Sequence, residues 1–399
     1  MLLIIPAEST LIVLLAVLTL GLIIPELLKK FRLPFITLII LAGAVFGPNL
    51  LGYVQVDAVV SFFGFLGMAF LMLMAGLETD MSVINKSKLK IIVMAVLNGF
   101  IPFLVGFGIM LFFGYPIETA VLIGIVFISS SVALIVPSLK EAKALSRNTI
   151  QLILAAVMVA DVISLIALGV IFQSNSPITI LPLWIYFPLL IVSIGILFKI
   201  VPKVSDFIMQ KELTGYKNYE EKLRFVVIML IGILLYFSLL GVHPILAAFL
   251  AGLSLSKVVM KEKTKIVHTK LHTLGYGMFV PVFFFVVGME LDLGVLWNVN
   301  SMSLILPVLI VGSILAKLGS GYFAGKIVGL SKKASLVFGS ISTTQLTTTL
   351  AVTYAAAALG LLDSLIVSSI IILALITTFV GPVLAKRFGS KPEEEFYSD

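Results

Sequence analysis

The chain has 399 residues, of which 60% are hydrophobic and 12% charged, and its mean hydropathy is +1.20. A soluble protein of this size needs more polar residues to cover its surface, so the composition excludes a soluble globular protein and indicates a membrane protein. The net charge of +7 then indicates basic loops on one side of a membrane rather than nucleic-acid binding, and the absence of cysteine excludes disulfides and thiolate metal sites.

Apolar stretches longer than about 18 residues recur along the chain, and each can cross a hydrocarbon core of about 30 Å. The first lacks the basic region of a signal peptide, so we expect a retained helix. The chain is therefore expected to be an all-α membrane protein of about thirteen transmembrane helices. We place them at residues 2–28, 33–51, 59–79, 90–113, 117–138, 148–173, 178–201, 222–240, 243–257, 272–289, 301–327, 334–358 and 361–386.

Basic residues segregate between alternate loops of this arrangement. Every Lys and Arg except Lys317 falls in loops or at helix ends on one side, whereas the other loops carry acidic residues such as Asp57, Glu118 and Asp363 and no Lys or Arg. Cytoplasmic loops carry the excess of Lys and Arg. The N-terminus is therefore predicted outside an inner cell membrane, and the C-terminus in the cytoplasm.

The fifth predicted helix, 117–138, is interrupted by Ser129, Ser130 and Ser131. Runs of Ser and Thr can satisfy the backbone groups that a broken helix frees in lipid. They can also join continuous helices through polar contacts. We interpret the run as a helix break and take Ser130 and Ser131 as candidate ion-binding residues; polar contact between continuous helices is the alternative.

Asp161 lies in the middle of the sixth predicted helix, in LILAAVMVADVISLIALGV. A carboxylate at the bilayer centre costs roughly 2.5–3.5 kcal/mol on insertion scales, so its presence indicates a function. Burial favours the protonated form of a carboxyl group, and a bound cation favours the carboxylate. Asp161 can thus hold either a proton or a metal cation, which is the minimum that an antiporter needs, and Ser164 follows one turn later. A purely structural carboxylate, hydrogen-bonded in the bundle, is the alternative.

The tenth predicted helix repeats a pattern from the third. FLMLMAGLETDMS contains Gly76, and FFFVVGMELDLG contains Gly288, 212 residues later. Near this offset, residues 34–43 match residues 244–252. The shift is seven helices, an odd number, so the second copy crosses the membrane in the opposite sense. This pattern predicts an inverted-topology repeat, which is typical of secondary transporters.

Lys317, in the eleventh predicted helix, is the only Lys or Arg away from the ends of the predicted spans. It could pair with Asp161, carry a proton itself, or bind the carbonyls of a helix end. Snorkelling to the membrane surface is the alternative.

The twelfth predicted helix, 334–358, contains a second polar run, STTQLTTTLA. The offset of 212 carries Ser130 and Ser131 to Ser342 and Thr343. We therefore expect two broken helices that cross each other and present backbone carbonyls and dipoles to an ion. In this interpretation the supporting residues of the second break are Thr343, Thr344 and Gln345.

The sequence resembles the monovalent cation/proton antiporter family related to the Nap and Kef proteins. The resemblance covers nearly the whole membrane region. The phrases that carry it are FLMLMAGLETDMS, ILAAFLAGLSLS, MFVPVFFFVVGMELDL and AKLGSGYFAGKIVGLSKKASLVFGS. It implies that the ion-binding aspartate of the family is Asp161, that the lysine of the later repeat is Lys317, and that the fifth and twelfth helices cross.

The resemblance also implies a homodimer with a mobile core. Its dimer domain would comprise residues 1–80 and 222–290 (helices 1–3 and 8–10), and its core domain residues 88–173 and 301–387 (helices 4–6 and 11–13). Residues 178–201 would form a linker helix, and residues 388–399 a short cytoplasmic tail.

Two departures from the family pattern bear on stoichiometry. Electrogenic members carry two adjacent aspartates, whereas the first position here is Ala160, and the Arg-Gly-Glu phrase of many relatives is replaced by STTQLTTTLA. One carboxylate makes the exchange of one cation for one proton the simpler expectation. Two protons per cation would require that Lys317 also cycles one.

The sequence as a whole predicts a sodium/proton antiporter of the inner membrane that serves pH homeostasis, with Li⁺ or K⁺ as alternative cations. We expect no cofactor and no nucleic-acid partner, only cations, protons, lipid and a second copy of the chain. The alternative is a cation-coupled symporter of an organic anion on a related crossed-helix fold. An enzyme is not expected, because an intramembrane aspartyl protease needs two carboxylates that share a site.

Overall fold

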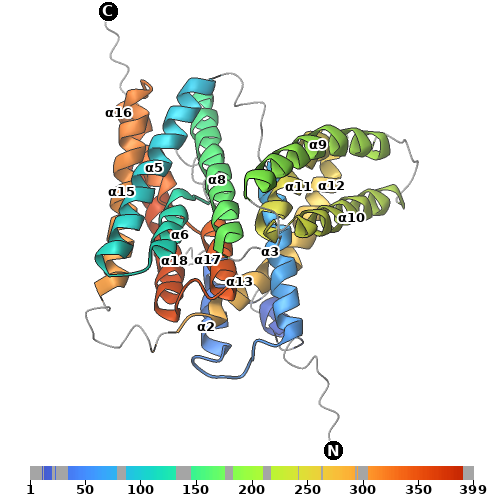
Figure 1. Cartoon of the computed structure of the whole chain (residues 1–399), viewed down its shortest axis with the longest axis horizontal. Coiled ribbons are helices and arrows are strands. Elements are labelled where there is room, and N and C mark those ends of the chain that lie inside the picture. Colours follow the sequence, from blue (N-terminus) through green and yellow to red (C-terminus); the bar gives the residue numbers. More distant parts are fainter. Residues whose placement is uncertain are drawn as a thin grey trace, which may run out of the picture. The chain divides into compact units, whose positions relative to one another are not determined.

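All regular elements in the described part of the chain are helices, as drawn for the computed structural model in Figure 1. In lipid, a helix satisfies its own backbone groups, which is why apolar stretches of this length fold as helices. The predicted all-α class is confirmed. The residues that the structure describes are 11, 13–19, 23, 35–78, 87–131, 145–175, 183–209, 217–240, 242–261, 264–292, 294 and 304–389.

The helices follow the predicted spans along the chain. In order they are α2 (Phe35–Phe46), α3 (Ala58–Glu78), α5 (Lys88–Phe112), α6 (Ile117–Ile128), α8 (Arg147–Asn175), α9 (Leu183–Met209), α10 (Lys217–Leu239), α11 (Pro244–Val259), α12 (Lys265–Leu274), the π-helix η2 (Gly275–Phe279), α13 (Val280–Met289), α15 (Ile305–Ile327), α16 (Lys332–Ser342), α17 (Thr347–Ala358) and α18 (Ser364–Gly389). Within the described ranges, eight helical segments are long and apolar enough to cross a membrane. The chain is therefore a multi-pass membrane protein.

Two predicted boundaries fall inside longer helices. The seventh span was predicted to end at residue 201, but α9 continues to Met209, because hydropathy detects the apolar part of a helix and misses a charged end. In that end, Asp206 accepts a hydrogen bond from Lys261 at 2.5 Å. The tenth span begins at Lys265 rather than at residue 272, for the same reason.

Both ends of the chain are only partly described. The predicted first helix, 2–28, lies largely outside the described residues, although residues 13–19 within it are helical. At the other end α18 continues to Gly389. The first two residues of the predicted tail, 388–399, are therefore helical, and the remainder of the tail lies outside the described residues.

The contacts within the chain divide it into two compact units, each built from both halves of the sequence. The first unit comprises Met1–Asp80 and Gly169–Glu290, and the second comprises Met81–Leu168 and Leu291–Asp399. The division falls within α8, a few residues before the end of the core segment predicted at residues 88–173. The roles assigned to the predicted domains, dimerisation and movement, stay predictions.

Two helix pairs of the first unit cross at glycines. A Cβ atom added at Gly76 of α3 would lie 2.2 Å from the carbonyl oxygen of Phe249 in α11. A Cβ atom at Gly288 of α13 would lie 2.0 Å from that of Ile40 in α2. In the repeat, α2 corresponds to α11 and α3 to α13, so these two crossings are equivalent. Both rely on small residues that let helix backbones touch, and they support the inverted repeat in three dimensions.

The substitution Gly76→Ala tests this crossing. The added methyl group has no space against the α11 backbone, so we expect the free energy of unfolding to fall by about 1–3 kcal/mol, as for overpacking. Unfolding of the purified protein in detergent measures it. The control is Gly232→Ala in α10, where no atom lies within 4 Å of the added Cβ, and where the free energy should rise by up to about 0.5–1 kcal/mol. Equal effects at the two positions would contradict a close crossing at Gly76.

Candidate functional site

Two helices of the second unit are broken at the positions predicted from the polar runs. α6 ends at Ile128, and Ser129 after it has extended backbone, with φ −67° and ψ 155°. α16 ends at Ser342, and the helix resumes only at Thr347. The continuation of the predicted helix 117–138 beyond Ser131 lies outside the described residues. The two breaks are confirmed.

The two breaks lie against each other and satisfy each other's polar groups. The backbone N–H of Ser131 donates to the carbonyl oxygen of Thr344 at 2.7 Å. The hydroxyl groups of Ser129 and Thr349 share a hydrogen bond of 2.7 Å. The side-chain amide of Gln345 donates to the carbonyl of Phe127, at the end of α6, at 3.4 Å. Backbone groups freed by the breaks are thus paired inside the protein, as lipid requires.

Asp161 points its carboxylate at this crossing. Its side chain, on α8, is buried, with 7% of the residue exposed. Oδ1 accepts a hydrogen bond from the backbone N–H of Ser130 at 2.9 Å, and Oδ2 lies 3.5 Å from the hydroxyl of Thr348 on α17. Ser164 instead donates its hydroxyl to the backbone carbonyl of Asp161 at 2.8 Å. Ser164 therefore binds the main chain of this residue, and the two carboxylate oxygens face the broken helices.

Lys317, on α15, is fully buried at the end of α6. Its Nζ donates to the carbonyl oxygen of Ile128 at 2.5 Å and to the hydroxyl oxygen of Ser130 at 3.1 Å. Ile128 is the last residue of α6, so the ammonium group lies at the negative end of that helix dipole. Of the roles considered from the sequence, binding the carbonyl of a helix end is the one that these contacts match.

Ser130 connects the two charged residues. Its backbone N–H binds Asp161, and its hydroxyl accepts from Lys317 and donates to the carbonyl of Ser342 at 2.9 Å. The lysine amino group and the aspartate carboxylate therefore share one residue of the broken segment. The link is made through hydrogen bonds of Ser130, with its backbone on one side and its side chain on the other.

The other predicted supporting residues occupy the second break. The Gln345 side chain accepts from the Ser313 hydroxyl at 3.4 Å, and its backbone carbonyl accepts from the Thr377 hydroxyl at 3.2 Å. Thr344 contributes its backbone carbonyl to the crossing, as described above. Thr343 donates its hydroxyl to the carbonyl of Ser340 at 2.7 Å, within its own helix. Thr343 therefore ends its helix and directs no hydroxyl at Asp161.

Sequence reasoning missed Asn98, a buried polar residue on α5. It is 1% exposed, and its Oδ1 accepts from the hydroxyls of Ser320 at 3.0 Å and Ser342 at 3.2 Å. The side-chain nitrogen of Asn98 has no hydrogen-bond partner among the described residues. The available signal was an amide in the middle of the apolar span KLKIIVMAVLNGFIPFL. Thr348 was also missed, because nothing in the Thr347–Thr349 run singles out the member that faces Asp161.

The oxygen atoms at the crossing are all hard ligands. They come from one carboxylate, several hydroxyls and backbone carbonyls, which suit hard cations. Among the described residues, no three His, Asp or Glu side chains gather as a ligand set for a resident metal. The arrangement offers oxygen ligands of the kind that hard cations bind.

The comparisons with known proteins agree on one family. A family model described as "Sodium/hydrogen exchanger, transmembrane" matches residues 13–388. The "Probable Na(+)/H(+) antiporter 3" of Methanocaldococcus jannaschii is 28% identical over 388 residues, which cover 95% of this chain and 97% of that protein. The "Na(+)/H(+)-K(+) antiporter GerN" of Bacillus cereus is 27% identical over 359 residues, which cover 88% of this chain and 89% of that protein.

A solved structure shows the same fold. The sodium proton antiporter MjNhaP1 from Methanocaldococcus jannaschii, at pH 8, superimposes with a TM-score of 0.74 at 17% sequence identity. The superposition covers 96% of this chain and 99% of that one. The helical arrangement is therefore that of a known transporter fold.

Proposed function

The chain belongs to the transmembrane sodium/hydrogen exchanger family, and from that premise we propose that it exchanges Na⁺ for H⁺ by competition at Asp161. The observation that carries the proposal is a buried carboxylate, in an apolar span, whose oxygens face two crossed and broken helices. The first break contributes Ser130 and Ser131 to the proposed site. The residues that support this site are Lys317, Gln345 and Thr348. Family membership also confirms the resemblance found in the sequence.

The competition follows from the surroundings of the carboxylate. A buried carboxylate is unfavourable unless a charge compensates it or a proton neutralises it. A sodium ion or a proton at Asp161 meets this need equally, but the two cannot occupy the same oxygens at once. Binding of one therefore releases the other.

The contacts of Lys317 favour the exchange of one cation for one proton. Its Nζ donates to Ile128 and Ser130, and both acceptors stabilise the charged ammonium form. When Lys317 stays protonated, Asp161 with Na⁺ and Asp161 with H⁺ carry the same total charge. In this proposal the exchange moves no net charge across the membrane.

The movement and orientation that we propose extend the sequence predictions. The core domain, residues 88–173 and 301–387, carries Asp161 between the two faces, while residues 1–80 and 222–290 form the interface of a homodimer. The segregation of Lys and Arg supports an inner-membrane protein with its N-terminus outside and its C-terminus in the cytoplasm. No resident cofactor takes part, and the exchange serves pH homeostasis.

Transport by proteoliposomes tests the proposal. Purified protein is reconstituted in vesicles that contain a pH-sensitive dye, and Na⁺, Li⁺ and K⁺ are added separately while membrane current is recorded. We expect Na⁺ to drive proton movement in the absence of any organic anion and without steady current. The name of the Bacillus cereus relative makes K⁺ a necessary comparison. Proton movement that requires an organic anion would replace the antiporter with the symporter alternative.

Thr348 is expected to contribute to cation affinity. Its hydroxyl lies 3.5 Å from Oδ2 of Asp161, a separation that one cation can bridge, since a hard cation such as Ca²⁺, close to Na⁺ in radius, lies about 2.3–2.6 Å from its oxygen ligands. Thr348→Val removes this oxygen and keeps the shape. We expect the apparent KM for Na⁺ to rise about 5- to 10-fold, the equivalent of one hydrogen bond.

The matched control at this position is Thr348→Ser, which keeps the hydroxyl and should retain the KM of the wild type within about twofold. Both variants are assayed for Na⁺-driven proton movement over a range of Na⁺ concentrations. An unchanged KM in Thr348→Val would remove Thr348 from the cation site.

A further inference from the structure

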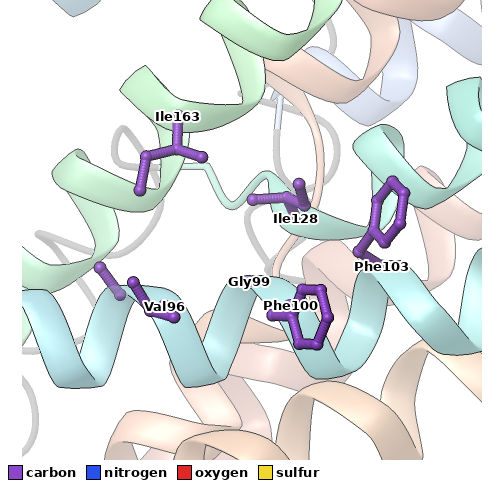
Figure 2. A pocket seen from close by; sticks show the side chains of 7 residues that line it. Val96, Gly99, Phe100, Phe103, Ile128 and Ile163 are labelled. Atoms are coloured by element: carbon purple, nitrogen blue, oxygen red, sulfur yellow. The ribbon is translucent and has the colours of Figure 1, made fainter.

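A cavity of about 330 Å³ lies in the second unit, where α5 faces the end of α6 and the middle of α8 (Figure 2). Its volume is within the range of small-molecule sites, which starts at about 300 Å³. The side chains that line it are all apolar, so a water molecule inside would lack the polar partners that buried water needs. The lining residues are Ala95, Val96, Gly99, Phe100, Phe103, Ile128 and Ile163.

The cavity opens onto an apolar face of a membrane-spanning helix. Ile92, Val96, Phe100 and Leu104 are spaced four residues apart on α5, so they share one face. Between 46% and 57% of each residue is exposed. Val96 and Phe100 belong both to this face and to the cavity wall, so the cavity is continuous with a surface that a lipid bilayer covers.

The depth of the cavity in the span matches hydrocarbon. With a rise of about 1.5 Å per residue, residues 95–103 lie roughly 10–22 Å from the start of α5, whose length is about 37 Å. The middle of a transmembrane helix lies among lipid acyl chains, far from the headgroups. The medium in contact with the opening is therefore hydrocarbon.

We propose that this cavity binds an acyl chain of a bilayer phospholipid. An apolar cavity of about 150 Å³ accepts benzene, so this larger one accommodates a bent segment of a flexible chain. Phe100 and Phe103 both line the cavity, and their ring planes are nearly parallel, at an angle of 11°. In Figure 2 Phe103 lies to the right of Ile128 and Phe100 below it, whereas Val96 and Ile163 lie to the left.

A bound acyl chain would pack against the apolar side of the residues that form the proposed ion site. The Ile128 side chain lines the cavity, while its carbonyl oxygen accepts from Lys317. Ala160, next to Asp161, packs with Ala95 and Ile128 in one apolar cluster. The acyl chain thereby supports the end of α6 from the apolar side. Any effect of this support on Na⁺/H⁺ exchange rests on the proposed function, whereas binding of the acyl chain does not.

Fluorescence quenching by brominated lipid tests the binding. Phe100→Trp is made in a background in which Trp184→Phe and Trp297→Phe remove the native tryptophans, and it is reconstituted with phosphatidylcholine that carries brominated acyl chains at increasing mole fraction. The matched control is Leu104→Trp, one turn further along the same face and outside the cavity wall. We expect the tryptophan at position 100 to reach half-maximal quenching at a lower mole fraction than that at position 104, and to stay quenched for longer on dilution into unbrominated lipid.

A second variant tests whether the stronger quenching expected at position 100 depends on the cavity or only on the position of the tryptophan. Adding Val96→Phe to Phe100→Trp fills the cavity, and we expect its quenching curve to coincide with that of Leu104→Trp. Identical curves for the two tryptophan positions without the filling mutation would mean ordinary lipid contact and overturn the proposal. Weaker quenching at position 100, with cross-linking between copies of the chain through Val96→Cys, would mean that a second copy covers the cavity, and would also overturn it.

Discussion

Replacement of Asp161 by Asn is expected to reduce Na⁺-driven proton movement in proteoliposomes to the level of vesicles without protein. The amide has the shape of the carboxyl group, and its oxygen can still accept from the backbone N–H of Ser130, which lies 2.9 Å from Oδ1 in the wild type. It neither releases a proton nor compensates a cation. The variant therefore separates the charge of Asp161 from its structural role.

The stability of the same variant is part of the expected result. A neutral amide replaces a buried carboxyl group, so the free energy of unfolding should stay within about 1 kcal/mol of the wild type or rise. The control is Asp206→Asn, the same chemical change in α9, where the carboxylate pairs with Lys261 at the surface. This control should exchange at the wild-type rate. Wild-type exchange by Asp161→Asn would disprove competition at this residue.

Replacement of Lys317 by Met is expected to lower the free energy of unfolding by about 1–3 kcal/mol, the cost of leaving a buried acceptor unpaired. The Ile128 carbonyl and the Ser130 hydroxyl lose their donor. Thermal and denaturant unfolding in detergent measure the change. Lys326→Met, at an exposed position of the same helix, should change it by less than about 0.5 kcal/mol. A similar change in the two variants would mean that Lys317 does not hold the end of α6.

Current recordings on the Lys317→Met variant address the proton count. We expect no steady current from the wild type, and none from any exchange that the variant retains. Current that is present in the wild type and absent from the variant would assign a second transported proton to Lys317. The stability and current measurements therefore distinguish a structural lysine from a transported charge.

Most of the fold could be predicted because lipid leaves few choices to an apolar stretch of about 20 residues. The two breaks were predictable for a different reason. Polar runs at Ser129–Ser131 and Thr343–Gln345 are costly in continuous helices, and the offset of 212 residues places them at equivalent points of an inverted repeat. Charged helix ends escaped the prediction, as at Met209 of α9, because hydropathy does not register a helix that continues into polar surroundings.

The site was predictable only as far as side chains carry the signal. Asp161 and Lys317 are conspicuous as charges within apolar spans. The acceptor of Lys317, however, is a backbone carbonyl, and every residue has one, so no residue type at position 128 could have indicated it. The choice of Thr348 among three threonines depends on how α17 is rotated, which is set by packing across the whole unit.

The contact between Ser130 and Asp161 has a consequence for how relatives are compared. The aspartate is held by a main-chain N–H, which every residue except proline supplies. Substitution at position 130 can therefore remove the hydroxyl that accepts from Lys317 and leave the backbone hydrogen bond to the Asp161 carboxylate unchanged. Two exchangers with different amino acids at this point can bind their aspartate in the same way, and sequence divergence there reports on the side-chain contacts with the lysine and with the Ser342 carbonyl.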